Sequence, residues 1–151
     1  METLNLPPFA YKLKQSDANS LIFDALRRKY VLLTPEEWVR QHFIHYLIND
    51  LRYPKSLISV ERGTRYNTLQ KRTDVCIYNL DGKPHLLIEC KAARVPITQD
   101  VVKQVSVYNQ TIQAKFIVIT NGLEHYCWEL DFETRSFKPL QSIPAYTSIQ
   151  S

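Results

Sequence analysis

A stripe of hydrophobic residues at helical spacing follows the pair Thr34-Pro35. Threonine is a frequent N-cap, proline suits the first helical turn, and the acids that follow face the positive end of the helix dipole. The pattern predicts a helix from Thr34 to about Leu51. Its hydrophobic stripe consists of Val39, Phe43, Tyr46, Leu47 and Leu51.

A second helical stripe follows Pro96 and Thr98 and predicts a helix to about Gln113. Its hydrophobic members are Val101, Val105, Tyr108 and Ile112. Between and after the helices, runs rich in β-forming residues predict strands. These strands are expected over residues 57–66, 73–80, 83–92, 115–120 and 124–130.

Two turn signals organise the strands. Asp81-Gly82 separates residues 73–80 from 83–92 and predicts an antiparallel hairpin with positive φ at both turn positions. Asn121-Gly122 joins the last two strands. The order helix, strand, hairpin, helix, strand, strand predicts an α/β fold with a mixed central β-sheet flanked by helices.

The ends of the chain are less strongly patterned. In residues 1–33, Leu21–Phe23 and Tyr30–Leu33 are compatible with extended structure, whereas Arg27–Lys29 fits helix, strand or loop. The length of 151 residues suits one domain, 1–151, with a core at about 20–138 and a loosely ordered tail at 139–151.

Composition narrows the functional classes. No basic segment followed by an apolar stretch begins the chain, and no apolar run approaches the roughly 18 residues of a membrane span, so a cytoplasmic protein without membrane contact is expected. Reduced thiols are expected, because the cysteines form no CxxC pair. The four histidines show no metal-ligand spacing, and no nucleophile elbow or phosphate-binding glycine loop is present, which disfavours zinc, acyl-transfer and NTP-driven chemistry.

The net charge of +4 is unevenly distributed. Between Arg52 and Arg72 the basic residues face one acid, Glu61. Lysine and arginine displace counterions from nucleic acid, so this stretch is either a DNA-contacting surface or a solvated basic loop. The DNA-contacting residues proposed in it are Arg62, Arg65 and Arg72.

Register on the predicted hairpin brings two carboxylates together. A turn centred on Asp81-Gly82 places Asp74 directly opposite Glu89, with Val75 facing Ile88. Because side chains alternate along a strand, Asp74, Glu89 and Lys91 share one face, and the opposite face is apolar. The apolar face is expected to hold Val75, Ile77, Leu86, Ile88 and Cys90.

Facing carboxylates repel unless a cation lies between them, which is the physical argument for a metal site. Mg²⁺ prefers oxygen ligands and keeps several waters, so Asp74, Glu89 and the backbone carbonyl of Cys90 would form a partial shell, in which Mn²⁺ could substitute. Lys91 can orient a water or neutralise phosphate charge during phosphodiester hydrolysis. A Glu-x-Lys on a strand is also common on solvated faces, but residues 85–93 are otherwise apolar enough for a buried strand.

The segment TDVCIYNLDGKPHLLIECKAA resembles the signature hairpin of the PD-(D/E)XK nuclease superfamily. Together with LTPEEWVRQHFIHYLI, the helix bearing Gln104 and Tyr108, and FIVITNG, it resembles the N-terminal nuclease domain of type I restriction enzyme R subunits over about residues 20–130. The resemblance implies Mg²⁺-dependent DNA cleavage, with Asp74 and Glu89 as ligands and Lys91 as a catalytic residue. No helicase motor follows in this sequence, and Thr73 stands where the motif has proline.

Further candidates for the site lie on the two predicted helices. Gln104 and Tyr108 resemble the QxxxY element of some nucleases in this superfamily, and their spacing on one helix face suggests that both point inward, Gln104 as a catalytic residue and Tyr108 as a DNA contact. Glu36 or Glu37 could supply another carboxylate, with Glu36 preferred. The structural alternatives are a helix-dipole role for the glutamates, hydrogen bonding of Gln104 to backbone groups, and a core role for Tyr108.

The sequence therefore predicts a DNA endonuclease domain that acts in restriction or DNA processing. The alternative is a non-catalytic DNA-binding or assembly module that joins other subunits of a restriction complex. DNA is the expected partner in both cases, and metal-dependent cleavage distinguishes them.

Overall fold

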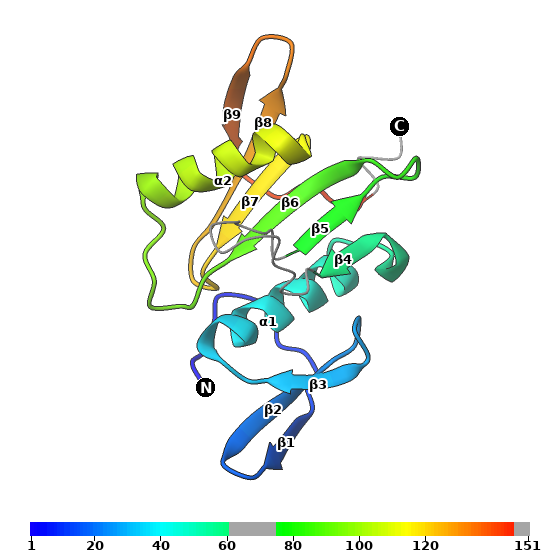
Figure 1. Cartoon of the computed structure of the whole chain (residues 1–151), viewed down its shortest axis with the longest axis vertical. Helices are drawn as coiled ribbons and strands as arrows, with labels where there is room; N and C mark the ends of the chain where they lie inside the picture. The colour runs from blue at the N-terminus through cyan, green and yellow to red at the C-terminus, as the bar shows by residue number, and fades with distance from the viewer. Residues whose placement is uncertain (61–74, 147–151) are drawn as a thin grey trace.

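The computed structural model describes residues 1–60 and 75–146, which form two β-sheets with a helix between them (Figure 1). The larger sheet has six strands in the order β4-β5-β6-β7-β8-β9, and the smaller has three in the order β1-β2-β3. In the larger sheet β6 and β7 run parallel, and the other neighbours are antiparallel. The expected fold class, a mixed sheet flanked by helices, is confirmed.

The helix α1 spans Pro35–Asn49 and begins as predicted, because the side chain of Thr34 accepts a hydrogen bond from the backbone N–H of Glu37 at 3.0 Å. It lies between the two sheets in Figure 1. Residues 37–44 of this helix are all buried, which fits a helix covered on more than one side. The sheets and α1 therefore share one hydrophobic core.

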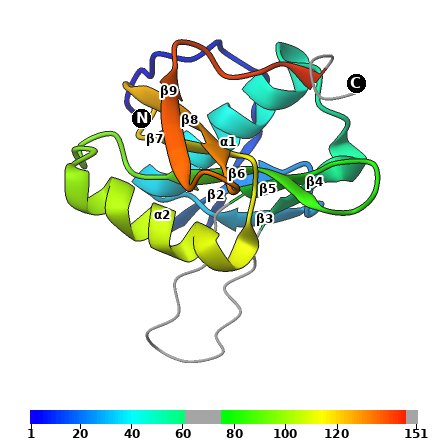
Figure 2. The same ribbon diagram turned by 90° about the horizontal axis from the view of Figure 1, so that it is seen from above.

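Alternate residues of the central strands enter two different hydrophobic clusters. The α1 cluster includes Val39, Phe43, Leu47, Val75, Ile77, Leu86, Ile88, Cys90 and Val118. The α2 cluster consists of Cys76, Leu87, Val105, Ala114, Ile117 and Ile119. Because side chains alternate across a strand, α1 and α2 cover opposite faces of the larger sheet, as Figure 2 also shows.

The hairpin of β5 (Val75–Tyr78) and β6 (Pro84–Cys90) has the predicted register, since Val75 pairs with Ile88 and Ile77 with Leu86. The expected apolar face is confirmed. Within the described residues, β5 ends at Tyr78 and β6 ends at Cys90, both two residues before the predicted ends, and the register shifts between Ile77 and Tyr78.

The turn of this hairpin differs from the predicted two-residue turn, because Gly82 has positive φ (82°) and Asp81 does not. The physical reason lies in Asn79, which organises a longer turn. Its backbone carbonyl accepts a hydrogen bond from Gly82, and its side chain accepts one from the backbone of Lys83 at 2.9 Å.

The second helix, α2, spans Gln99–Ile112 and is capped by the Thr98 side chain, as predicted. It leads through the left-handed residue Gln113 to β7 (Phe116–Thr120), which is followed by β8 (His125–Asp131) and β9 (Ser136–Leu140). Upstream, a short 3-10 helix, Lys55–Leu57, replaces the start of the strand expected at 57–66, and β4 covers Ile58–Val60. The rest of that expected strand lies outside the described residues.

The N-terminal region forms the smaller sheet from β1 (Leu13–Ser16), β2 (Asn19–Asp24) and β3 (Lys29–Leu32). Both segments considered extended in the sequence are strands, while β1 and β9 were not predicted. No helix within the described ranges has the length and apolar character needed to cross a membrane.

Residues 139–146 differ from the expected loose tail. The hydroxyl of Tyr53 donates a hydrogen bond to the carbonyl of Pro144 at 2.5 Å, and the backbone of Tyr146 donates one to Leu51 at 2.8 Å. Leu140, Ile143 and Tyr146 pack against the α1 cluster. Leu4 and Leu6 also join this cluster, so the core extends before residue 20 as well. The last five residues of the chain lie outside the described part.

The turn between β7 and β8 yields a prediction about stability. Gly122 has φ of 86°, and a Cβ built there would lie 2.9 Å from Leu4 and 3.2 Å from Val39. Gly82 has nearly the same φ (82°) with nothing within 4 Å of such a Cβ. We expect Gly122→Ala to lower the free energy of unfolding by about 1–3 kcal/mol more than Gly82→Ala, because only the former overpacks the core. Urea denaturation measures both, and equal losses would contradict the close approach.

Candidate functional site

The candidate site lies at the carboxyl ends of the parallel strands β6 and β7. Cys90 and Thr120 pair at this end, and the backbone of Lys91 continues the ladder with a 2.8 Å hydrogen bond to the carbonyl of Thr120. The loops that leave these two strands lead to α2 and to β8. Ligands of open α/β sheets bind outside the carboxyl ends of parallel strands, so this edge is the natural place for a site.

Glu89 and Lys91 lie on the same face, as predicted, and their side chains are in contact. The ammonium Nζ of Lys91 is 3.4 Å from Oε2 of Glu89, and the side chains are 23% and 20% exposed, respectively. They follow Leu87 on the face covered by α2, where the hydrophobic packing ends. A carboxylate and an ammonium group are thus partly accessible at the end of a strand that is otherwise buried on both faces.

Asp74, the predicted partner of Glu89, lies outside the described residues. The ladder reaches Val75 opposite Ile88, so the observed register leads toward the expected pair, which stays a prediction. Arg62, Arg65 and Arg72, the proposed DNA contacts, lie in the same undescribed segment.

The described residues hold few groups that could together bind a metal ion. Among residues 1–60 and 75–146, no group of three or more His, Cys, Asp and Glu side chains could hold one. Asp74 lies outside these residues. The side chain of Cys90 is buried in the α1 cluster, on the face opposite Glu89, so only its backbone carbonyl could serve as a ligand. Carboxylate and carbonyl oxygens are the ligands that Mg²⁺ prefers, so the proposed set fits that ion.

The two α2 candidates have different environments. Tyr108 is half-buried and packs against the α2 cluster, as expected. Gln104 is exposed, so the expectation that it points inward is wrong. Successive helix residues are rotated by about 100°, and the helix buries the side of Val105, which turns the neighbouring Gln104 away from the sheet.

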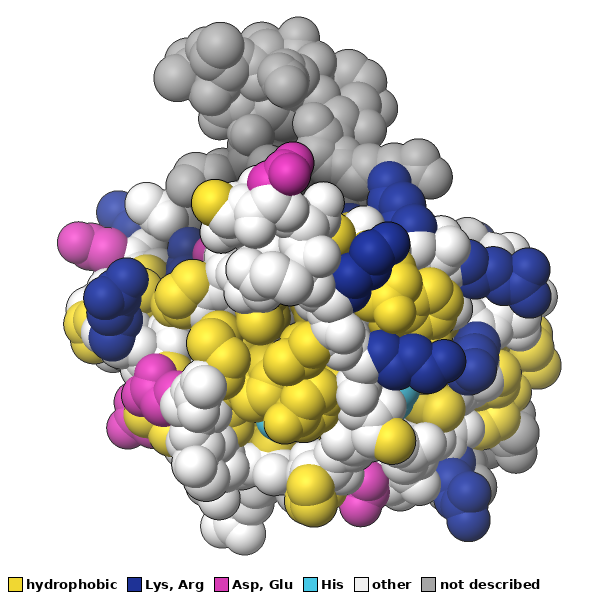
Figure 3. Space-filling model, turned by 90° about the horizontal axis from the view of Figure 1, so that it is seen from below, with side chains coloured by type: hydrophobic (Ala, Val, Ile, Leu, Met, Phe, Trp, Pro, Cys, Tyr) yellow, Lys and Arg dark blue, Asp and Glu magenta, His cyan; other side chains and the backbone are white. Residues whose placement is uncertain are grey.

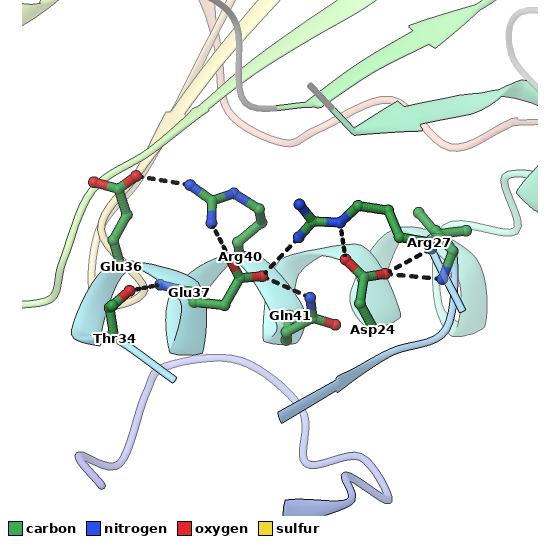
Figure 4. Close-up of polar contacts among 8 residues, drawn as sticks. Asp24, Arg27, Thr34, Glu36, Glu37, Arg40 and Gln41 are labelled. Carbon is green, nitrogen blue, oxygen red and sulfur yellow. Dashed lines mark hydrogen bonds and ion pairs between the residues drawn. The ribbon is translucent and has the colours of Figure 1, made fainter. Parts of the chain in front are cut away.

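The helix-start candidates, Glu36 and Glu37, are both ion-paired with Arg40 (Figure 4). The side chain of Glu36 is 45% exposed and lies 2.7 Å from Arg40. Glu37 is buried and also accepts hydrogen bonds from Gln41 at 2.7 Å and Arg27 at 3.3 Å. Glu37 is thus the centre of the network, although the sequence analysis preferred Glu36 as the additional site carboxylate.

The same network fixes the turn between β2 and β3. Asp24 is fully buried, pairs with the Arg27 guanidinium at 2.5 Å, and accepts hydrogen bonds from the backbones of Leu26 and Arg27. Burial acts to raise the pKa of Asp24, but the hydrogen bonds and charge of Arg27 outweigh it and hold this pKa below its usual value. Sequence reasoning missed this cluster, although the Asp-x-x-Arg spacing of Asp24 and Arg27 between two possible strands was a usable turn signal.

The chain is an α/β protein with a mixed sheet, and an acid and a lysine lie at the end of its central strand. In proteins of this class, functional residues are often carried by loops on a rigid scaffold. It belongs to the family described as type I restriction enzyme R protein N terminus (HSDR_N), whose model matches residues 35–144. A relation to restriction systems is therefore established, while the smaller sheet lies before the matched region.

A solved structure is also similar to part of the chain. It is a fragment described as an HsdR subunit of a type I restriction enzyme from Vibrio vulnificus YJ016, with 26% identity and a TM-score of 0.38. The match covers 58% of this chain and 16% of that one, so this chain spans a small part of that protein's length. No curated protein matches the chain.

The ion-pair network yields a prediction that separates the two glutamates. Glu37→Gln should lower the free energy of unfolding by about 3 kcal/mol, because it removes one partner of buried ion pairs. Glu36→Gln is the matched control and should change stability by less than about 1 kcal/mol, since an exposed pair contributes little. Urea denaturation of both variants tests this, and a larger loss for Glu36→Gln would reverse the assignment.

Proposed function

We propose that this chain is a Mg²⁺-dependent DNA endonuclease domain of a restriction system, with Asp74, Glu89 and Lys91 as its active centre. The observation that carries the proposal is the contact of Glu89 and Lys91 at the carboxyl end of β6, at 3.4 Å and with both side chains partly exposed. The family supplies the restriction context. The resemblance of the hairpin sequence to the PD-(D/E)XK signature suggests the reaction, phosphodiester hydrolysis.

The roles follow from the chemistry of each group. Asp74, Glu89 and the carbonyl of Cys90 would hold Mg²⁺, and Mn²⁺ should substitute because it accepts similar oxygen ligands. When bound, the ion would lower the pKa of a water and offset the charge of the phosphate. Lys91 donates hydrogen bonds to the attacking water or to a phosphate oxygen, and its contact with Glu89 keeps the ammonium beside the reacting group.

The remaining candidates belong to the substrate side of the proposal. Arg62, Arg65 and Arg72 would contact backbone phosphates, since arginine binds them in a bidentate manner. Tyr108, half-buried on α2, could contact DNA through its hydroxyl. Gln104, exposed on the same helix, keeps a place in the site only if the DNA itself approaches α2.

Cleavage tests the proposal directly. Plasmid and single-stranded DNA should be cut by the wild type in Mg²⁺ or Mn²⁺ and left intact in EDTA. Asp74→Asn, Glu89→Gln and Lys91→Ala should each lower the rate by about 100-fold or more, because each removes a metal ligand or a proton-handling group. Lys83→Ala, at an exposed position in the same hairpin, is the control and should cut at the wild-type rate. Equal rates for Lys91→Ala and Lys83→Ala would sink the catalytic assignment.

Metal binding can be measured without cleavage. Millimolar Mg²⁺ or Mn²⁺ should raise the melting temperature of the wild type, because the ion binds the native state preferentially. The increment should shrink sharply in Asp74→Asn and in Glu89→Gln, whereas their stability without metal should hold or improve as the carboxylate repulsion is removed. Differential scanning calorimetry with and without metal gives both values. No cation-dependent shift in the wild type would favour the non-catalytic assembly module.

A further inference from the structure

The smaller sheet has an outer face that carries aromatic rings and lysines. Ile22 and Asp24 of β2 are fully buried toward α1, so the alternating residues Leu21 and Phe23 point to the other side. Residues directly opposite one another in a ladder share a face, which adds Tyr30, Leu32 and Lys14. The backbone of Phe23 also donates a hydrogen bond to the carbonyl of Lys12, which places Lys12 beside this ring.

The rings and lysines of this face contact one another in pairs. The Lys12 ammonium lies 5.5 Å from the centroid of the Phe23 ring, and the Lys14 ammonium lies 5.1 Å from that of Tyr30. Phe23 and Tyr30 themselves are 5.2 Å apart, edge to face. Leu32, at one border of the face, is 51% exposed. Phe23 and Tyr30 are therefore half-buried rings at the surface, and a lysine ammonium lies over each of them.

The charge around this face is strongly positive. Asp24 is buried and paired with Arg27, so Asp17 is the exposed acid of residues 9–33. The exposed cations are Lys12 and Lys14 on this face, Arg28 in the adjoining turn, and Lys29, which lies opposite Asp24. Within the described part of the chain, neither Lys12 nor Lys14 forms an ion pair with a carboxylate. Figure 3 views this end of the molecule and shows hydrophobic side chains exposed beside a group of lysines and arginines.

We propose that the outer face of the β1-β2-β3 sheet binds single-stranded DNA. Bases stack on exposed aromatic rings whatever their sequence, and lysines beside the rings neutralise the phosphates. A base can replace the ammonium group over each ring, and the released lysine then reaches the adjacent phosphate. The positive charge complements a polyanion, which distinguishes this occupant from an apolar protein surface.

The geometry favours an unpaired strand over a duplex. Bases in a duplex are already stacked on their neighbours, about 3.4 Å apart along each strand, and offer no free face. The 5.2 Å separation of Phe23 and Tyr30 suits bases that have come apart along an extended strand. The face precedes residue 35, so it lies outside the region that the family model matches. The inference rests on the proposed function in one respect: the bound single-stranded DNA is taken to be part of the nuclease substrate.

Binding in EDTA tests the inference apart from cleavage. Fluorescence anisotropy of a labelled 20-residue oligothymidine should show roughly tenfold or greater weakening in the double variant Phe23→Leu/Tyr30→Leu, because stacking is lost while apolar volume is kept. The double variant Lys12→Gln/Lys14→Gln keeps both rings and should flatten the slope of log affinity against log salt by about 1.4, since each phosphate contact on a single strand contributes about 0.7. Phe137→Leu/Lys138→Gln, on the exposed strand β9, is the matched control and should bind as the wild type does.

The outcomes separate the two proposals. If both double variants of the β1-β2-β3 sheet bind the oligothymidine with the affinity and salt slope of the wild type, the inference is overturned, even if the protein cuts DNA. Equal weakening in the β9 control, or tighter binding of a duplex of the same length, would also overturn it. Circular dichroism and melting temperature confirm that each variant is folded, and the lysine variant decides the matter if loss of the rings prevents folding. Face-dependent binding without any Mg²⁺-dependent cleavage would support the inference and count against the nuclease.

Discussion

Burial of β6 on both faces is the constraint on which the rest of the structure depends. The strand has neighbours on both edges, α1 on one face and α2 on the other, so its residues must be apolar along most of its length. Charges are tolerated where this burial ends, which is at Glu89 and Lys91. The parallel pairing with β7 then directs two loops to the same end. The candidate site is therefore a product of where the core stops.

The helix α1 connects this core to the smaller sheet through polar and apolar contacts together. Its residues Phe43 and Leu47 belong to the cluster that supports β6, while Glu37 binds Arg27 in the turn after β2. Buried ion pairs fix one arrangement more than they add free energy, because desolvation offsets much of the attraction. The orientation of the smaller sheet relative to α1 is thus set by these ion pairs together with the packing of Ile22 and Val31, and its outer face has a defined direction.

Much of the larger sheet could be predicted because its signals are local. Thr34 and Thr98 mark helix starts, and alternation in the hairpin gave the pairing of Val75 with Ile88 and the division of its faces. The hairpin turn was predicted wrongly, since the Asp-Gly signal was outweighed by the hydrogen bonds of Asn79. The prediction that Gln104 points inward was wrong. A spacing of four residues shows which side chains are neighbours on a helix, but it does not show which side of the helix is covered.

The parts that sequence could not give depend on contacts between distant segments. The packing of residues 139–146 relies on Tyr53, about ninety positions earlier, and no local pattern near Pro144 indicates it. The smaller sheet is similar, since β1 is exposed at every position and has no hydrophobic alternation to reveal it. The sequence favoured Glu36 over Glu37, because it does not show that the distant residue Arg27 reaches Glu37 together with Arg40 and Gln41.

The positions of the two tryptophans give the molecule a pair of intrinsic optical reporters. Trp38 is buried in the α1 cluster, where its indole donates a 2.8 Å hydrogen bond to the carbonyl of Glu2. Trp128 packs against the α2 cluster on the other side of the sheet. Replacing either one by phenylalanine leaves a single tryptophan on a known face, which can be excited selectively over the tyrosines at the long-wavelength edge of its absorption. Fluorescence from each form would therefore follow loosening of one layer independently of the other, without any attached dye.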